Sequence, residues 1–134
     1  MRVYITTALE IELEDETWRC AHCDHSIASA RENYKTGCLV ADRPPAEIHA
    51  PIIDADKYDI TFSPDPDWCA ILEFCCPSCG TLIEVEYLPP GHPPAYDIEL
   101  DIDALRAQVE ARPEQSGPVI GPDFVAPPHH GHGH

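Results

Sequence analysis

Two short stretches decide the fold: Trp18-Arg19-Cys20-Ala21-His22-Cys23-Asp24-His25 and Phe74-Cys75-Cys76-Pro77-Ser78-Cys79-Gly80. Each contains a Cys-x-x-Cys pair, and two such pairs in a small protein are typical of a tetrahedral four-thiolate zinc site. Two residues between the cysteines allow a tight turn to direct both sulfurs at one ion. Gly80 suits that turn, because the position after the second ligand often needs a positive φ. We predict that Cys20, Cys23, Cys76 and Cys79 bind one Zn²⁺ ion.

A four-cysteine site indicates a structural metal rather than a catalytic one. Four ligands fill the tetrahedral shell, so no position stays open for water or substrate. Disulfides and simply packed thiols are the alternatives, but an acidic chain with an odd number of cysteines and no signal-peptide pattern disfavours disulfides. A single iron ion uses the same four-thiolate geometry and remains an alternative to zinc.

Cys75 competes with its neighbour Cys76 for the metal. Cys75 would need a three-residue spacer to Cys79, whereas Cys76 keeps the two-residue spacing. Side chains of a strand that enters the turn point alternately to opposite faces. Cys75 should therefore point away from the ion that Cys76 binds.

Composition restricts the partners of this 134-residue chain. Its 24 acidic and 8 basic residues give a net charge of −16, and the basic residues are scattered singly. Phosphate binding needs clustered Lys and Arg, so nucleic acid and anionic membrane surfaces are unsuitable partners. A basic protein surface is the natural complement. Without a leader or a long apolar run, the chain is expected in the cytoplasm, where cysteines stay reduced.

Hydrophobic periodicity predicts a mainly β fold with little helix. Residues 3–13 alternate apolar and polar positions, which indicates one half-buried strand or two short ones. Residues 70–74 and 82–88 should form a hairpin through the second cysteine turn. The predicted class is a zinc-ribbon-like domain with a long insertion and an extended, proline-rich C-terminal tail.

The remaining local patterns are weaker. Residues 27–35 have helical spacing that ends at Gly37, and residues 42–45 should open an extended loop because Pro44 and Pro45 cannot donate ladder hydrogen bonds. Residues 96–102 alternate like a strand and precede a short helix capped by Asp103.

The separation of the two cysteine pairs predicts the domain organisation. Residues 24–75 separate them, whereas a compact ribbon uses about fifteen to twenty. We predict one β domain over 1–112 with an insertion at 39–68, followed by a Pro- and His-rich tail over 113–134. The insertion is most simply explained by contact with another chain. The terminal histidines, 129–134, are as consistent with a solvated tail as with a metal site.

No catalytic set is recognisable in the sequence. There is no glycine-rich phosphate loop and no Gly-x-Ser-x-Gly motif, and the paired carboxylates fit a solvated acidic surface. His22 and His25 are interpreted as surface residues near the thiolates. Cys38 and Cys69 are interpreted as buried apolar residues.

These features together resemble a known family. The opening strand, the Trp-Arg-Cys-Ala-His-Cys turn, Arg31-Glu32-Asn33-Tyr34-Lys35 and the later Cys-Pro-Ser-Cys-Gly are similar to the small gamma subunits of acetone carboxylase and acetophenone carboxylase. The resemblance covers about residues 1–90. The proline-rich end and Cys75 lie outside it.

The resemblance implies a subunit of a larger enzyme. Members of this family belong to biotin-independent, ATP-dependent ketone carboxylases whose larger subunits, similar to hydantoinases and oxoprolinases, carry the nucleotide and substrate sites. It implies that this chain is a non-catalytic zinc-binding component of a hetero-oligomer. The alternatives are a stand-alone zinc-ribbon interaction module, which lacks the expected basic stripe, and a mononuclear iron electron carrier.

Overall fold

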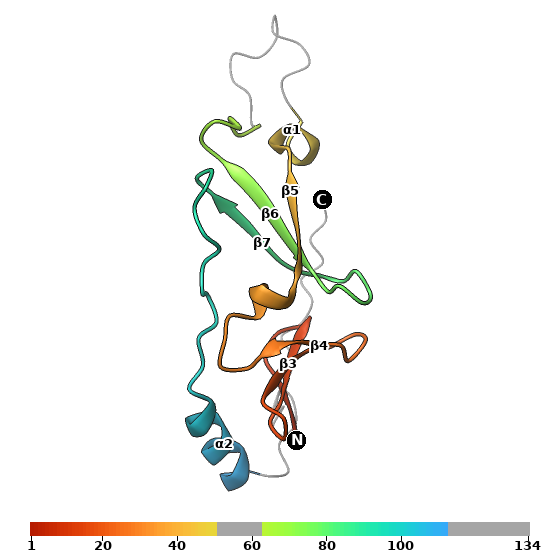
Figure 1. Ribbon diagram of the computed structural model, residues 1–134, viewed down its shortest axis with the longest axis vertical. Coiled ribbons are helices and arrows are strands. Elements are labelled where there is room, and N and C mark those ends of the chain that lie inside the picture. The colour runs from red at the N-terminus through yellow and green to blue at the C-terminus, as the bar shows by residue number, and fades with distance from the viewer. Residues whose placement is uncertain (51–62, 113–134) are drawn as a thin grey trace, which may run out of the picture.

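The computed structural model describes residues 1–50 and 63–112, and these form two antiparallel sheets with little helix. Figure 1 shows the sheets one beyond the other along the long axis of an elongated molecule. The predicted mainly β, zinc-ribbon-like class is confirmed. Residues 51–62 of the predicted insertion and the predicted tail, 113–134, with its histidines, lie outside the described residues.

The first sheet has the order β1-β2-β3-β4. Its strands are β1 (Arg2–Tyr4), β2 (Leu9–Glu12), β3 (Thr17–Cys20) and β4 (Ser26–Ser29). The pattern over residues 3–13 is therefore two short strands, because the Thr6 hydroxyl accepts a hydrogen bond from the Leu9 amide and the chain turns between them. The apolar alternation places Leu9 and Ile11 in the core.

The second sheet has the order β5-β6-β7, and its β6-β7 hairpin confirms the prediction around the second cysteine turn. Its strands are β5 (Leu39–Arg43), β6 (Ala70–Cys75) and β7 (Leu82–Leu88). The expectation of a loop from residue 42 is wrong in part. Residues 42 and 43 complete β5, the ladder ends before the two prolines, and α1 (Pro45–Ile48) begins at a proline. Proline is favoured at that first helical position because its missing N–H would be unpaired there anyway.

The helix expected over residues 27–35 is wrong. Residues 26–29 form β4 on β3, with Trp18 opposite Ala28, so pairing with an existing strand prevails over a short helical pattern. Asn33 then caps a 3₁₀ turn, η1 (Tyr34–Gly37). A Cβ at Gly37 would lie 1.7 Å from the Ile27 carbonyl oxygen, so this close approach requires glycine.

The strand expected over residues 96–102 is also wrong, although its apolar residues do lie on one side of the chain, toward the core. The chain runs from β7 along one side of the molecule to α2 (Ile102–Ala111) as an arm that pairs with none of the described strands (Figure 1). Ile98 and Leu100 pack against the core and Ile102 is buried. Period two indicates extended backbone but not a neighbouring strand. The helix cap is Asp101 rather than Asp103, and its carboxylate accepts from the Ala104 amide at 3.0 Å.

The main core lies between the first sheet, η1 and α2. Trp18 and Tyr34 meet edge to face with ring centroids 5.5 Å apart, and the Trp18 indole donates to the Glu32 carbonyl. Two of the motif cysteines, Cys20 and Cys76, belong to the same buried cluster, so the cysteine site and the core are continuous.

Among the described helices, none combines the length and apolar composition that a membrane span requires.

A buried lysine joins the second sheet, η1 and the arm. The ammonium of Lys35 contacts Glu86 at 2.8 Å and Asp97 at 3.2 Å, and donates to the Ala95 carbonyl at 2.9 Å. It also lies 5.1 Å from the ring centroid of Phe74. The side chain of Lys35 is only 2% exposed, and a buried charge is tolerated only when it is well paired. This network therefore fixes the arm to the second sheet.

We expect Lys35→Met to lower the free energy of unfolding by about 3 kcal/mol, because it leaves the partly buried carboxylates of Glu86 and Asp97 without their counter-charge, facing a buried apolar side chain. Chemical denaturation of the metal-loaded protein measures this change. Arg31→Met is the matched control: Arg31 also joins two carboxylates, Glu16 and Asp103, but is 49% exposed. The control should cost much less, because ion pairs of exposed side chains contribute little to stability. Equal losses in the two variants would contradict a special role for the buried network.

Candidate metal centre

The two cysteine turns have the same backbone geometry. The amide after each second cysteine donates to the carbonyl of the first: Asp24 to Cys20 and Gly80 to Cys76, both at 2.9 Å. The amides of Cys20 and Cys76 in turn donate to the residue five positions later, at 3.0 and 2.9 Å. Asp24 and Gly80 both have positive φ, 66° and 78°. Each turn therefore presents its two sulfurs in the same way, and the positive φ expected at Gly80 is confirmed.

The structure brings the four predicted ligand sulfurs together. Cys20 Sγ lies 3.7 Å from Cys79 Sγ, Cys23 Sγ lies 3.6 Å from Cys76 Sγ, and all four lie within 4.8 Å of one another. A tetrahedral ion with metal–sulfur distances of about 2.3 Å requires sulfurs separated by about 3.8 Å. The cluster therefore fits one tetrahedral ion, although metal binding itself stays a prediction. Within the described ranges, no other group of His, Cys, Asp or Glu side chains is arranged to share an ion.

Cys75 does not belong to the cluster. It ends β6 opposite Leu39 on one side and Leu82 on the other, whereas the next residue, Cys76, is fully buried within the core cluster. This arrangement agrees with the alternation argument that assigned Cys76 to the ion.

The surroundings of the four sulfurs differ in polarity. The Thr81 hydroxyl lies 3.0 Å from Cys79 Sγ, and this hydrogen bond, with one from the Thr81 amide, lowers the pKa of the exposed Cys79 thiol to about 6. Burial raises the pKa of Cys20 to about 11, although hydrogen bonds from the His22 and Cys23 amides act to lower it. When bound, a metal ion would replace the proton on each thiol, and the amides directed at Cys20 would stabilise the resulting thiolate.

The sequence alone did not predict three residues that support the first turn. Asp24 adopts the positive φ that glycine takes in the second turn, and the Arg2 guanidinium donates to its carboxylate. Arg19 donates to the Asp24 carbonyl at 3.2 Å. Aligning the two turns, Cys20-x-x-Cys23-Asp24 on Cys76-x-x-Cys79-Gly80, would have identified the position of Asp24. No local sequence signal identifies Arg2, which comes from a neighbouring region of the sheet.

The other described cysteines and histidines that the sequence singled out, which exclude residues 129–134, lie outside the cluster. Cys38 and Cys69 are half-buried rather than buried. The Cys38 thiol donates to the Tyr34 carbonyl at 3.5 Å, and burial raises its pKa to about 11, so it is not an activated thiol. His22 is exposed and His25 is half-buried.

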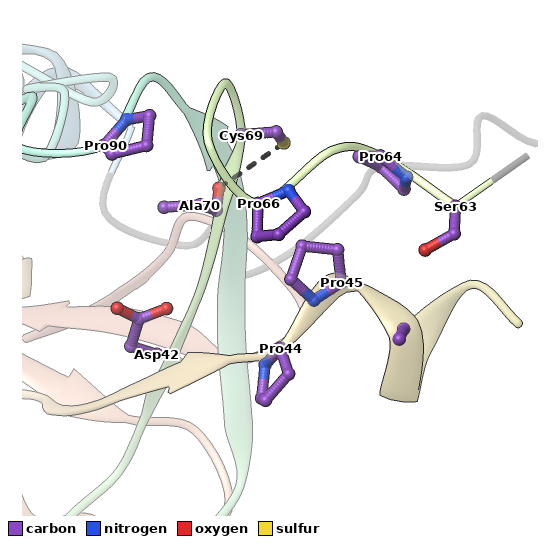
Figure 2. Close-up of a pocket in the computed structure, with 10 residues that line it drawn as sticks. Asp42, Pro44, Pro45, Ser63, Pro64, Pro66, Cys69, Ala70 and Pro90 are labelled. Carbon is purple, nitrogen blue, oxygen red and sulfur yellow. Dashed lines mark hydrogen bonds between the residues drawn. The ribbon is translucent and has the colours of Figure 1, made fainter. Parts of the chain in front are cut away.

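A hollow of about 450 Å³ lies at the other end of β6 from the cysteines. Figure 2 shows that prolines dominate its lining, with Asp42 and Cys69 as its titratable residues. The Cys69 thiol donates to the neighbouring Ala70 carbonyl at 3.8 Å. Among the described lining residues, the carboxylate of Asp42 and the thiol of Cys69 are not arranged as a nucleophile with an oriented base.

Comparisons with known proteins give one family match and two relatives. The family described as acetone carboxylase gamma subunit matches residues 2–110. The acetophenone carboxylase beta subunit of Aromatoleum aromaticum is 51% identical over 109 residues, which cover 81% of this chain and 82% of the relative. The acetone carboxylase gamma subunit of Xanthobacter autotrophicus is 33% identical over 66% of this chain and 49% of the relative. The acetophenone carboxylase relative is named a beta subunit, whereas the sequence resemblance led us to expect a gamma subunit. The acetone carboxylase relative is named a gamma subunit, as expected.

We expect Cys76→Ala to abolish binding of the metal ion and to unfold the region around the turns, because structural zinc contributes roughly 10 kcal/mol or more to the folding of small domains. The metal-to-protein ratio and thermal unfolding measure these effects. Cys75→Ala is the matched control, and it should retain the metal and most of the stability. Retention of metal by Cys76→Ala with loss in Cys75→Ala would show that the ligand assignment is wrong.

Gly80→Ala tests the turn without touching a ligand. A Cβ at Gly80 would meet nothing within 4 Å, so the substitution should cost only the strain of a positive φ, about 1–2 kcal/mol. Denaturant unfolding at saturating metal measures this difference, and one metal ion per chain should remain. A larger loss accompanied by loss of metal would mean that the turn does not have the geometry described.

Proposed function

We propose, because this chain belongs to the acetone carboxylase gamma subunit family, that it is a structural zinc-binding subunit of a ketone carboxylase. The observation that supports this function best is the cluster of four cysteine sulfurs, which leaves no coordination position for a substrate. The subunit's contribution is therefore to shape and hold the complex, while the chemistry takes place on other chains.

Zinc is the proposed metal. Four thiolates at tetrahedral spacing suit Zn²⁺, which has no redox chemistry of its own and is common in closed structural sites. When bound, the ion would join a turn of the first sheet to a turn of the second, through Cys20 and Cys23 on one side and Cys76 and Cys79 on the other. Its role would be to fix the relation between the two sheets.

We propose that larger subunits, similar to hydantoinases and oxoprolinases, carry the nucleotide, ketone and bicarbonate sites. In the proposed reaction ATP activates the substrates by phosphorylation, without biotin, and this chain contributes no catalytic residue. Its lack of a phosphate-binding loop supports that division of labour. The complex would work in the cytoplasm, where cysteines remain reduced and available to a metal. The relatives named acetophenone and acetone carboxylase subunits suggest a ketone as substrate.

Co-expression with the larger carboxylase subunits of the same organism tests this function. A tag on this chain should recover a stable hetero-oligomer with one zinc ion per copy of the chain and ATP-dependent carboxylation of a ketone. Cys76→Ala should reduce the amount of complex while leaving activity per mole of the remaining complex unchanged. An isolated chain that stays monomeric and does not bind the larger subunits would contradict the proposal. Bound iron, detected by its visible absorbance, would contradict the choice of zinc.

A further inference from the structure

Two of the four sulfurs in the cysteine cluster face solvent. Cys20 and Cys76 are buried, whereas Cys23 and Cys79 are exposed. The thiolate is the reactive form of cysteine, so an exposed ligand sulfur can attack an electrophile that reaches it from solvent. Each such reaction would remove a ligand from the ion. The side of the cluster formed by Cys23 and Cys79, which we call the exposed edge, is therefore the chemically vulnerable part of the centre.

Three groups of Thr81 contact the two ligands of the second turn. Its carbonyl accepts from the Cys76 amide at 2.9 Å, and its amide donates to Cys79 Sγ. Its hydroxyl oxygen lies 3.0 Å from the same sulfur. A metal-bound thiolate carries no proton, so the hydroxyl must be the donor when an ion is present. Both hydrogen bonds to Cys79 then withdraw negative charge from a sulfur that solvent reaches.

The place of Thr81 in the chain keeps its hydroxyl directed at the sulfur. Thr81 is half-buried and directly precedes β7, so its backbone continues into a paired strand. A β-branched side chain such as threonine has a restricted χ1 angle. Little conformational freedom is therefore lost when the hydroxyl donates to Cys79.

The first turn has no equivalent hydroxyl. The carbonyl of His25 accepts from the amide of the first cysteine there, as the carbonyl of Thr81 does in the second turn, so the two residues hold the same position. In the part of the chain that the structure describes, Thr81 is the one residue whose hydroxyl reaches a cluster sulfur. Cys23 is therefore an exposed ligand without this contact, and it serves as an internal reference for Cys79.

We propose that Thr81 protects the exposed edge of the metal centre, because it orients the Cys79 thiolate and lowers the nucleophilicity of its sulfur. The inference rests on the metal site of the proposed function but not on the partner subunits. Groups that hydrogen-bond to metal ligands orient and tune them, and hydrogen bonds to a charged acceptor are the stronger kind. Thr81 is a positioning residue, since it acts on the ion through Cys79.

Reaction of the zinc-loaded full chain with iodoacetamide measures this protection. The attacking sulfur forms a bond to carbon, and iodide leaves with the electron pair of its own bond to that carbon. Peptide mass spectrometry at early times gives the initial rate at each cysteine. We expect Thr81→Val to raise the rate at Cys79 about tenfold and to leave the rate at Cys23 unchanged, because one hydrogen bond to a charged group is lost.

Two further variants separate the hydroxyl from the shape of the side chain. Thr81→Ser keeps the hydroxyl and should react within about threefold of the unaltered chain. Thr36→Val removes a hydroxyl outside the cysteine cluster, where it donates to the Asn33 carbonyl at 2.9 Å, and should change neither rate. With Co²⁺ in place of Zn²⁺, the sulfur-to-metal charge-transfer band should shift in Thr81→Val and in neither of the other variants.

Equal rates at Cys79 in Thr81→Val and in the unaltered chain would overturn the inference, while the proposed function stands. A Thr81→Ser variant that reacts as fast as Thr81→Val would overturn the role of the hydroxyl. An equal rise at Cys23 and Cys79 would show that the whole site has loosened, and it would also overturn selective protection of Cys79. An unaltered chain that binds no zinc would instead refute the proposed metal site, on which this inference depends.

Discussion

The structure depends on one geometric requirement: four sulfurs from two distant turns must lie close enough to share a single ion. Each turn meets its half of that requirement locally, with the same pair of backbone hydrogen bonds and a positive φ at Asp24 or Gly80. The other half is tertiary, because one turn follows β3 and the other follows β6. Cys20 and Cys76 are also core residues, so the cysteine cluster is continuous with the core.

The Lys35 network acts as a second junction between the same parts of the chain. It connects η1 to β7 through Glu86 and to the arm through Asp97 and the Ala95 carbonyl. The tyrosine beside it, Tyr34, packs on Trp18 and donates to the Asp97 carboxylate at 3.0 Å, and burial raises its pKa. The Arg31-Glu32-Asn33-Tyr34-Lys35 segment thus has a physical role, because it joins the core of the first sheet to the second sheet and the arm.

Charge is distributed unevenly on this acidic chain. The basic residues of the first sheet and its surroundings are used internally: Arg2 and Arg19 hold the first cysteine turn, and Arg106 joins α2 to the Leu13 carbonyl and Glu16. Little positive charge is left to attract nucleic acid or an anionic membrane.

The sequence by itself determined the cysteine turns, the hairpin around the second turn and the choice of Cys76 over Cys75, because these follow from spacing and alternation within a few residues. It also indicated that Ile98, Leu100 and Ile102 face the protein. It did not determine that residues 26–29 pair with β3, that the arm lacks a ladder partner, or that Arg2 holds Asp24. Those outcomes depend on which surfaces meet after the chain has folded back on itself. Only the tertiary structure decided them, because hydrogen-bond partners far apart in sequence leave no periodic signal along the chain.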